Sequence, residues 1–169
     1  LHISIRRQLY LCIRFRSCNT EFELEWGIPV AFPVIDVLTL GAGGGSIAWV
    51  DKGGLLNVGP RSAGAKPGPA CYGTGGEQPT ITDANLVLGR INPDHFLAGE
   101  MPLSFEAAEL ALASVAEPFG MTNRALALAI IRIVNTNMVG ALRTVLVERG
   151  LDPLEFILLG FGGAGPLHA

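Results

Sequence analysis

The feature that most constrains this chain is its last fifteen residues, 155–169, which combine an apolar run with closely spaced glycines. Residues 156–159 are all apolar, which predicts a short strand buried on both faces. Gly160, Gly162, Gly163 and Gly165 follow within six positions, and Pro166 stands where a helix can begin. Such a loop lets backbone N–H groups approach an anion, and a helix N-terminus adds partial positive charge. A tight turn without a ligand is the alternative.

The spacing of these glycines also matches G-x-G-x-x-G, the fingerprint of dinucleotide-binding folds. The acidic residue that accompanies that fingerprint is expected roughly 20 residues further on, past Ala169. No Gly-Lys-Ser/Thr follows, which excludes a Walker A loop here. Spacing alone leaves a dinucleotide and a nucleotide triphosphate both open. We call residues 160–165 the C-terminal glycine loop.

Composition bounds the class of protein. With 49% hydrophobic and 16% charged residues, the 169-residue chain is globular and long enough for a core. The net charge is −3, and no basic stripe with interleaved aromatics appears, which argues against a nucleic-acid partner. The three cysteines, Cys12, Cys18 and Cys71, form no paired framework and no C-x-x-C. This favours a reduced, cytoplasmic location.

Residues 1–20 differ from the rest, since they hold four of the twelve basic residues and no acid. They loosely resemble a transit peptide, but their apolar positions follow no helical period. We therefore predict that 1–20 is an atypical terminus outside the fold and that 21–169 forms one incomplete domain. The chain begins with Leu1 and ends as a helix is expected to begin, which suggests a fragment of a longer protein.

Strand signals dominate the next forty residues. Phe22 and the alternation after it predict a half-buried strand, and residues 34–40 predict a second, buried one. Asp36 lies inside this apolar run, where a carboxylate is costly to bury without a donor or a cation. It is a candidate site residue, with a turn cap as the alternative. Residues 46–50 and 55–58 are expected to form a hairpin around a turn at 51–54.

Two glycine-rich segments flank this hairpin. Residues 41–46, here called the central glycine loop, read Gly-Ala-Gly-Gly-Gly-Ser and join two strands. Residues 59–79, here called the Gly/Pro loop, are long enough without regular structure to suggest a function. Arg61 in this loop is a candidate for pairing with a phosphate or carboxylate, and a solvated arginine is the alternative. Cys71 is expected to be a small buried filler, because no nearby base would lower its pKa.

Three helices are predicted after the Gly/Pro loop. The first spans about 82–88, with Thr82 or Asp83 as N-cap and Gly89 as terminator. The second follows Ser104 and ends near 118–120. The third runs from 122 to 149 with an apolar stripe, and its charged and amide residues favour a core helix over a membrane span. The polar cluster 135–137 is expected to form interhelix hydrogen bonds or to reach into a site.

Several of these motifs together resemble the hydantoinase A/5-oxoprolinase family, which includes the acetone carboxylase β-subunit. The matching segments are 36–46, 58–73, 82–85 and 161–169, in the family's order, and the likeness runs from about Glu21 to the last residue. The resemblance implies an α/β fold, namely part of an actin/hexokinase-like ATPase with a mixed sheet and packed helices. The family's Gly-Gly-Thr-Thr/Ser-x-Asp hairpin and its N-terminal phosphate hairpin are absent from this sequence.

For the full-length parent, the resemblance implies ATP-dependent ring opening of cyclic amides such as hydantoins or 5-oxoproline, or ATP-dependent ketone carboxylation. In both, phosphoryl transfer activates a carbonyl or enol oxygen. The implied cofactors are ATP and Mg²⁺ or another divalent metal, and the implied partners are a small-molecule substrate and a hydantoinase B-type subunit or domain. A dinucleotide-binding oxidoreductase fragment and a non-catalytic assembly module are the alternatives.

The resemblance and the residue types together give a set of candidate site residues. Asp36, Asp83 and His168 are the candidate catalytic residues, and Asp83 and His168 are also candidate metal ligands. We expect these three to converge on one polar site, with helix caps as the alternative. Arg61 is the candidate substrate-binding residue. The candidate nucleotide-binding residues come from the two glycine loops: Gly41, Gly43, Gly44, Gly45, Ser46, Gly162, Gly163 and Gly165.

Overall fold

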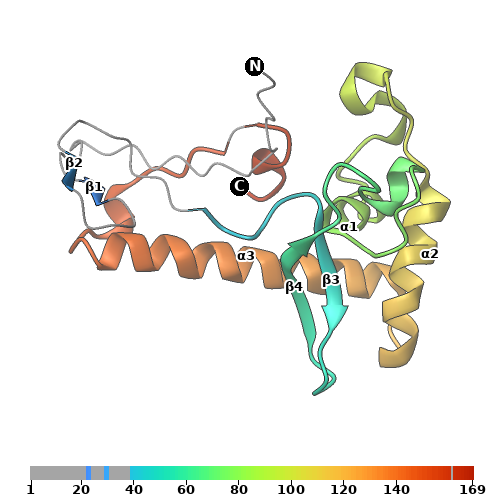
Figure 1. The fold of residues 1–169 in the computed structure, drawn as a ribbon, viewed down its shortest axis with the longest axis horizontal. Helices are drawn as coiled ribbons and strands as arrows, with labels where there is room; N and C mark the ends of the chain where they lie inside the picture. Colours follow the sequence, from blue (N-terminus) through green and yellow to red (C-terminus); the bar gives the residue numbers. More distant parts are fainter. Residues whose placement is uncertain (1–21, 24–28, 31–38, 161) are drawn as a thin grey trace.

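A computed structural model describes residues 22–23, 29–30, 39–160 and 162–169 (Figure 1). The predicted strand at 34–40 and the candidate residue Asp36 lie outside these residues, as does the predicted atypical terminus 1–20. Two short strands, β1 (Phe22–Glu23) and β2 (Pro29–Val30), pair antiparallel. The strand expected to begin at Phe22 is therefore present, and Pro29 opens the strand that pairs with it.

The predicted hairpin is confirmed. Strand β3 (Ser46–Val50) pairs antiparallel with β4 (Leu56–Ser62), and Trp49 faces Asn57 across the ladder. Asp51 closes the turn, because its Oδ1 accepts hydrogen bonds from the backbone N–H groups of Gly53 and Leu55 at 2.8 and 2.9 Å. Strand β4 runs further than expected and carries the chain into the Gly/Pro loop.

The three predicted helices are present as α1 (Ile81–Val87), α2 (Phe105–Ala116) and α3 (Asn123–Val147). Ser104 caps α2 and Thr122 caps α3 through their hydroxyl groups. The predicted N-cap of α1 is wrong, because Thr80 caps that helix in a capping box with Asp83. Shorter 3-10 turns occupy Ala70–Tyr72, Glu117–Phe119, Pro153–Glu155 and Gly165–Leu167. The segment Pro93–Gly99 is 3-10 only at its two ends, because the backbone angles from His95 to Ala98 are non-helical.

The core forms around α1, all seven of whose residues are buried. Helices α2 and α3 pack against α1 and against each other, and β3 and β4 close a further side (Figure 1). The largest apolar side chains that are fully buried are Ile81, Leu86, Leu112, Leu126, Ile130 and Val134. Each contributes about 1.5–3 kcal/mol relative to exposure, so α1 is held as a rigid centre between the hairpin and the two longer helices.

Helix α3 is only partly a core helix. Its first half contributes Leu126, Ile130 and Val134 to the core, but Val139 is 45% exposed and Val147 is 68% exposed. Figure 1 shows the second half extending well beyond α1 and α2. By length and composition alone, α3 is the one helix in the described part of the chain that could cross a membrane. Its buried stripe against α1 and α2 is that of a helix packed in a domain.

The predicted strand at 156–159 is wrong for this structure. The chain there forms no strand, and Ile157, Leu158 and Leu159 are 90%, 51% and 60% exposed. A strand buried on both faces needs neighbouring strands and covering layers, and the described residues supply neither. After it, Pro166 begins no α-helix and instead lies in the 3-10 turn Gly165–Leu167.

Candidate functional site

Asp83 is the most fully satisfied polar side chain in the described part of the chain. Its Oδ2 accepts hydrogen bonds from Thr80 N at 2.8 Å, Thr80 Oγ1 at 2.7 Å and Ala70 N at 3.3 Å. Its Oδ1 accepts from Cys71 N at 2.8 Å. The residue is 0% exposed, and both carboxylate oxygens are hydrogen-bonded, with three donors on Oδ2 and one on Oδ1. Asp83 therefore fastens the Gly/Pro loop to the start of α1.

This geometry bears on the predicted roles of Asp83. A carboxylate that already accepts four hydrogen bonds has to rearrange some of them before it can bind a metal ion. The hydrogen bonds found here favour an anchoring role, and the catalytic and metal-binding roles stay predictions. Asp83 has two structural roles, because it anchors the Gly/Pro loop and also completes the capping box of α1.

Cys71 lies beside this carboxylate and is fully buried. Burial raises the pKa of its thiol strongly, and the charge of Asp83 raises it further. The thiol therefore stays protonated at neutral pH and is a poor nucleophile. This agrees with the expectation that Cys71 is a small filler. Its carbonyl oxygen accepts from Ser104 N at 2.9 Å, so the same residue connects the Gly/Pro loop to the start of α2.

The central glycine loop folds around Ser46. Its Oγ accepts from Gly43 N at 2.9 Å and donates to Gly41 O at 3.2 Å. Its backbone N–H donates to Gly43 O at 2.8 Å. The hydroxyl of Ser46 therefore stabilises the loop from within, and the side chain is buried. Its predicted contact with a nucleotide stays a prediction.

The remaining carbonyl groups of this loop also face the protein. Gly44 O accepts from both the N–H and the Oγ1 of Thr82, each at 2.9 Å. Gly45 O accepts from Ala63 N at 2.8 Å. Within the described residues, the N–H groups of Gly44 and Gly45 have no hydrogen-bond partner. The loop thus turns its acceptors inward and leaves two successive donors unused, which is the polarity that an anion requires.

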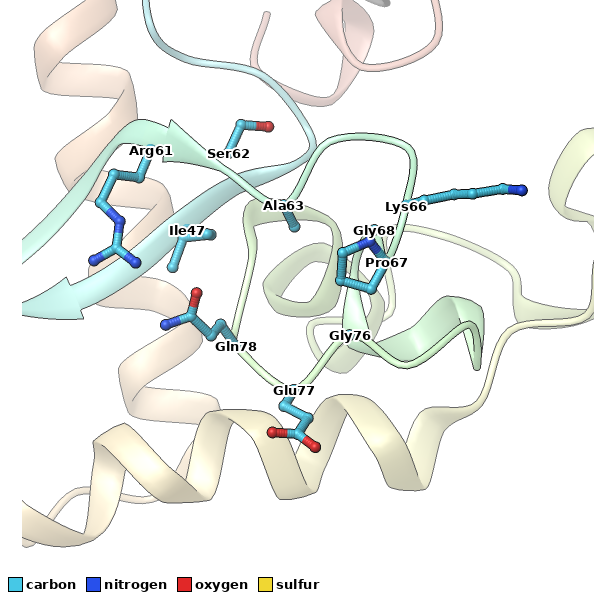
Figure 2. Close-up of a pocket in the computed structure, with 10 residues that line it drawn as sticks. All are labelled: Ile47, Arg61, Ser62, Ala63, Lys66, Pro67, Gly68, Gly76, Glu77 and Gln78. Carbon is cyan, nitrogen blue, oxygen red and sulfur yellow. The ribbon is translucent and has the colours of Figure 1, made fainter.

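Arg61 lies at a hollow of about 530 Å³ between the end of β4 and the Gly/Pro loop (Figure 2). Figure 2 shows the guanidinium of Arg61, the side chain of Ile47 and the amide of Gln78 on the same side of this hollow. Lys66 extends away from them on the opposite side. The predicted substrate-binding residue therefore stands where a small molecule has room. The lining residues are Ile47, Arg61, Ser62, Ala63, Lys66, Pro67, Gly68, Gly76, Glu77 and Gln78.

The residues that follow the C-terminal glycine loop contact α3 and the segment after α1. His168 Nδ1 lies 2.8 Å from Asn135 Oδ1 on α3. Arg90, just after α1, donates from Nη1 to Leu167 O at 3.4 Å. Within the described residues, His168 Nε2 is buried and has no hydrogen-bond partner. Burial lowers the pKa of His168, and the positive charge of Arg90 lowers it further, so the imidazole is neutral near pH 7.

Sequence reasoning missed the partner of His168. Asn135 was expected either to bond another helix or to reach into a site, and it bonds the segment that follows the C-terminal glycine loop. The available signal was a polar cluster in the middle of an otherwise apolar helix. Sequence position gave no means of pairing residues 33 positions apart.

The structure does not place Asp83 and His168 on shared partners. Asp83 bonds the Gly/Pro loop and Thr80, whereas His168 bonds α3. Among the residues that the structure describes, no three His, Cys, Asp or Glu side chains are grouped to hold a metal ion. The expected convergence also involves Asp36, outside the described residues, and stays a prediction.

The described residues form a domain of helices and a small antiparallel sheet, in which a glycine loop is hydrogen-bonded to a packed helix. The chain belongs to the hydantoinase/oxoprolinase family, whose model matches residues 12–169. This confirms the family resemblance. The match begins upstream of Glu21, where the resemblance was expected to start.

Individual relatives agree with this assignment. The caprolactamase α subunit of Pseudomonas jessenii is 52% identical over 140 residues, which is 82% of this chain and 20% of that protein. The acetophenone carboxylase γ subunit of Aromatoleum aromaticum is 47% identical over 146 residues, 85% of this chain and 20% of that protein. The chain therefore spans about a fifth of the length of these relatives.

Solved structures show the same relationship. The crystal structure of the ATP-dependent caprolactamase matches with a TM-score of 0.75 at 51% identity, over 83% of this chain and 20% of that one. The nucleotide-free structure of acetone carboxylase matches with a TM-score of 0.77 at 29% identity, over 94% of this chain and 22% of that one.

Proposed function

We propose that this chain is part of an ATP-dependent enzyme that opens cyclic amides or, in the related branch, carboxylates a ketone. The observation that carries the proposal is the polarity of the central glycine loop. Its carbonyl groups are bonded by Thr82, Ala63 and Ser46, while the N–H groups of Gly44 and Gly45 remain without partners in the described residues. Two adjacent backbone donors suit the oxygens of a phosphate. The proposed fold of the complete enzyme is the actin/hexokinase type.

The chemistry proposed for the whole enzyme is phosphoryl transfer to a carbonyl or enol oxygen, for which positioning and charge neutralisation supply most of the catalysis. ATP supplies the phosphoryl group. The residues described here are suited to holding phosphate oxygens and the adenosine side through the two glycine loops. Mg²⁺ is proposed to bind the phosphate oxygens together with one or two protein ligands, for which Asp83 and His168 stay the candidates.

The proposed substrate contact is Arg61. Its guanidinium and the Gln78 amide offer donors and an acceptor on one side of the hollow, over the apolar side chain of Ile47 (Figure 2). This combination suits a small planar amide or carboxylate with an apolar edge. The caprolactamase relative favours a lactam as the first substrate to test. Two relatives are named as subunits, which supports a partner subunit, and we propose that this partner is of the hydantoinase B type. The proposed location of the enzyme is the cytoplasm.

A calorimetric titration with ATP tests the nucleotide site. Gly163→Val in the full-length parent is the informative variant, because a Cβ at Gly163 meets no atom of the described residues within 4 Å. We expect the variant to lose ATP affinity at an unchanged melting temperature. Gly140→Ala on α3, where a Cβ is also free, serves as control and should keep the affinity. Equal affinity in Gly163→Val and the wild type would count against the C-terminal glycine loop as a nucleotide site.

Turnover gives a second test. The chain lacks both phosphate hairpins of the family, so residues 1–169 alone should not hydrolyse ATP, with or without a lactam. Magnesium- and substrate-dependent release of phosphate by the purified chain would contradict the proposal that ATP hydrolysis needs the two phosphate hairpins.

A further inference from the structure

The side chain of His168, just after the C-terminal glycine loop, contacts Asn135 on α3. His168 lies three residues after Gly165, and its Nδ1 is 2.8 Å from Asn135 Oδ1, in the middle of α3. An amide oxygen can only accept a hydrogen bond, so this contact is a hydrogen bond in the tautomer whose ring proton is on Nδ1. Because the imidazole is neutral, Nε2 must then be the unprotonated nitrogen. One hydrogen bond thus sets both the tautomer and the plane of the ring.

We propose that Asn135 is a positioning residue for the C-terminal glycine loop, acting through the imidazole of His168. This inference rests on the proposed nucleotide function of that loop and adds to it a residue on α3. The bond joins positions 33 apart in sequence, and among the described residues it is the side-chain hydrogen bond that the ring makes. Arg90 adds a second connection from the end of α1, by donating to Leu167 O at 3.4 Å.

The helix that carries Asn135 is suited to this task. Val134, beside it, is 1% exposed, and Ile131 and Met138, one turn to either side, are 2% and 5% exposed. This part of α3 therefore packs in the core. Asn135 itself is only partly buried, at the edge of the packed stripe. A rotamer held by such surroundings gives the precision that a binding loop requires.

The unpartnered Nε2 atom supports a role beyond packing. It is buried without a hydrogen-bond partner in the described residues, and most buried polar atoms of folded proteins have one. In the Nδ1–H tautomer this atom is an acceptor, so it suits an O–H or N–H donor. Nucleotides carry such donors on the ribose and the adenine ring. A ring fixed only for packing has no need of an open acceptor beside a glycine loop.

The tautomer of His168 in the 169-residue protein is measured by nitrogen-15 NMR of labelled histidine, near pH 7 and without nucleotide. Wild type and Asn135→Asp, which keeps an acceptor oxygen, should show the Nδ1–H form. Asn135→Leu, which removes it, should lose this preference. Asn137→Leu is the control, because Asn137 is exposed on the same helix. Wild type in the Nε2–H form, or Asn135→Leu with unchanged tautomer populations, would overturn the proposal.

Titration with ADP completes the test. Asn135→Leu should weaken binding by roughly three- to tenfold, the equivalent of one hydrogen bond, while Asn135→Asp and Asn137→Leu bind as the wild type does. A shifted tautomer with unchanged ADP affinity would overturn the positioning role. If the wild type itself binds no ADP while the tautomer shifts as expected, the nucleotide function fails and the orientation of His168 by Asn135 stands.

Discussion

Cys71 donates its backbone N–H to the Oδ1 of Asp83 at 2.8 Å, and both residues are fully buried. This contact connects the middle of the Gly/Pro loop to the first turn of α1. Thr82, one residue before Asp83, bonds Gly44 from the same turn. A single helical turn therefore fixes the Gly/Pro loop on one side and the central glycine loop on the other. The local sequence 80–83 determines where both loops lie.

The first prediction concerns the stability of this turn. Asp83→Ala leaves the N–H groups of Ala70, Cys71 and Thr80 buried without an acceptor, and we expect a loss of at least about 3 kcal/mol in the free energy of unfolding. Urea denaturation measures it. Asp94→Ala, at an exposed position, is the control and should change stability by less than about 0.5 kcal/mol. A stable Asp83→Ala protein that has lost only catalysis in a complete enzyme would instead support the catalytic role.

Much of this fold could be predicted because its signals are local. The hairpin at 46–62 follows from alternating residues around a glycine turn, and Ser104 and Thr122 are recognisable as N-caps. The missed cap of α1 is also local, since Thr80 and Asp83 have the spacing of a capping box. The sequence predicts Thr82 or Asp83 as the N-cap, but both residues lie inside the helix.

Other features depend on contacts that no local pattern contains. The apolar run 156–159 reads as a buried strand, but a strand requires neighbours, and the described residues leave it exposed. His168 contacts Asn135, and Asp83 accepts a hydrogen bond from the backbone of Cys71. Both contacts depend on how α1, α2 and α3 pack together. Residue types predicted two glycine loops as candidate nucleotide sites, and only packing shows that the carbonyl groups of Gly44 and Gly45 in the central glycine loop are bonded by Thr82 and Ala63.

The second prediction uses the thiol of Cys71. Its pKa is raised in the folded state, mainly by burial, so the unfolded chain loses this proton first as pH rises. Stability from this group is complete below about pH 8.5 and declines above it, by about 2 kcal/mol between pH 8 and pH 10. Comparing denaturation of wild type and Cys71→Ala, both with Cys12 and Cys18 replaced by serine, isolates the effect. Equal pH dependence of the two proteins would contradict it.

The third prediction concerns the backbone at the start of the Gly/Pro loop. Gly59 has a φ of +69°, and a Cβ there would collide with the carbonyl oxygen of Gly41. Gly59→Ala should therefore destabilise the protein by more than about 2 kcal/mol. Gly140→Ala, in the open helical surface of α3, should do the reverse and stabilise it by about 0.8 kcal/mol. Thermal denaturation of the two variants beside the wild type shows whether the signs are opposite.

The last prediction concerns how the stability contributed by His168 changes at acidic pH. The pKa of His168 is lowered in the folded state, first by burial and then by Arg90, so the unfolded chain takes up a proton more readily as pH falls. The stability from neutral His168 is complete above about pH 6.5 and is lost as pH drops through the lower, folded pKa. His168→Gln should therefore show a shallower loss of stability between pH 7 and pH 5 than the wild type. NMR titration of the histidine ring protons checks the direction independently, and a His168 pKa at or above 6.5 would refute the prediction.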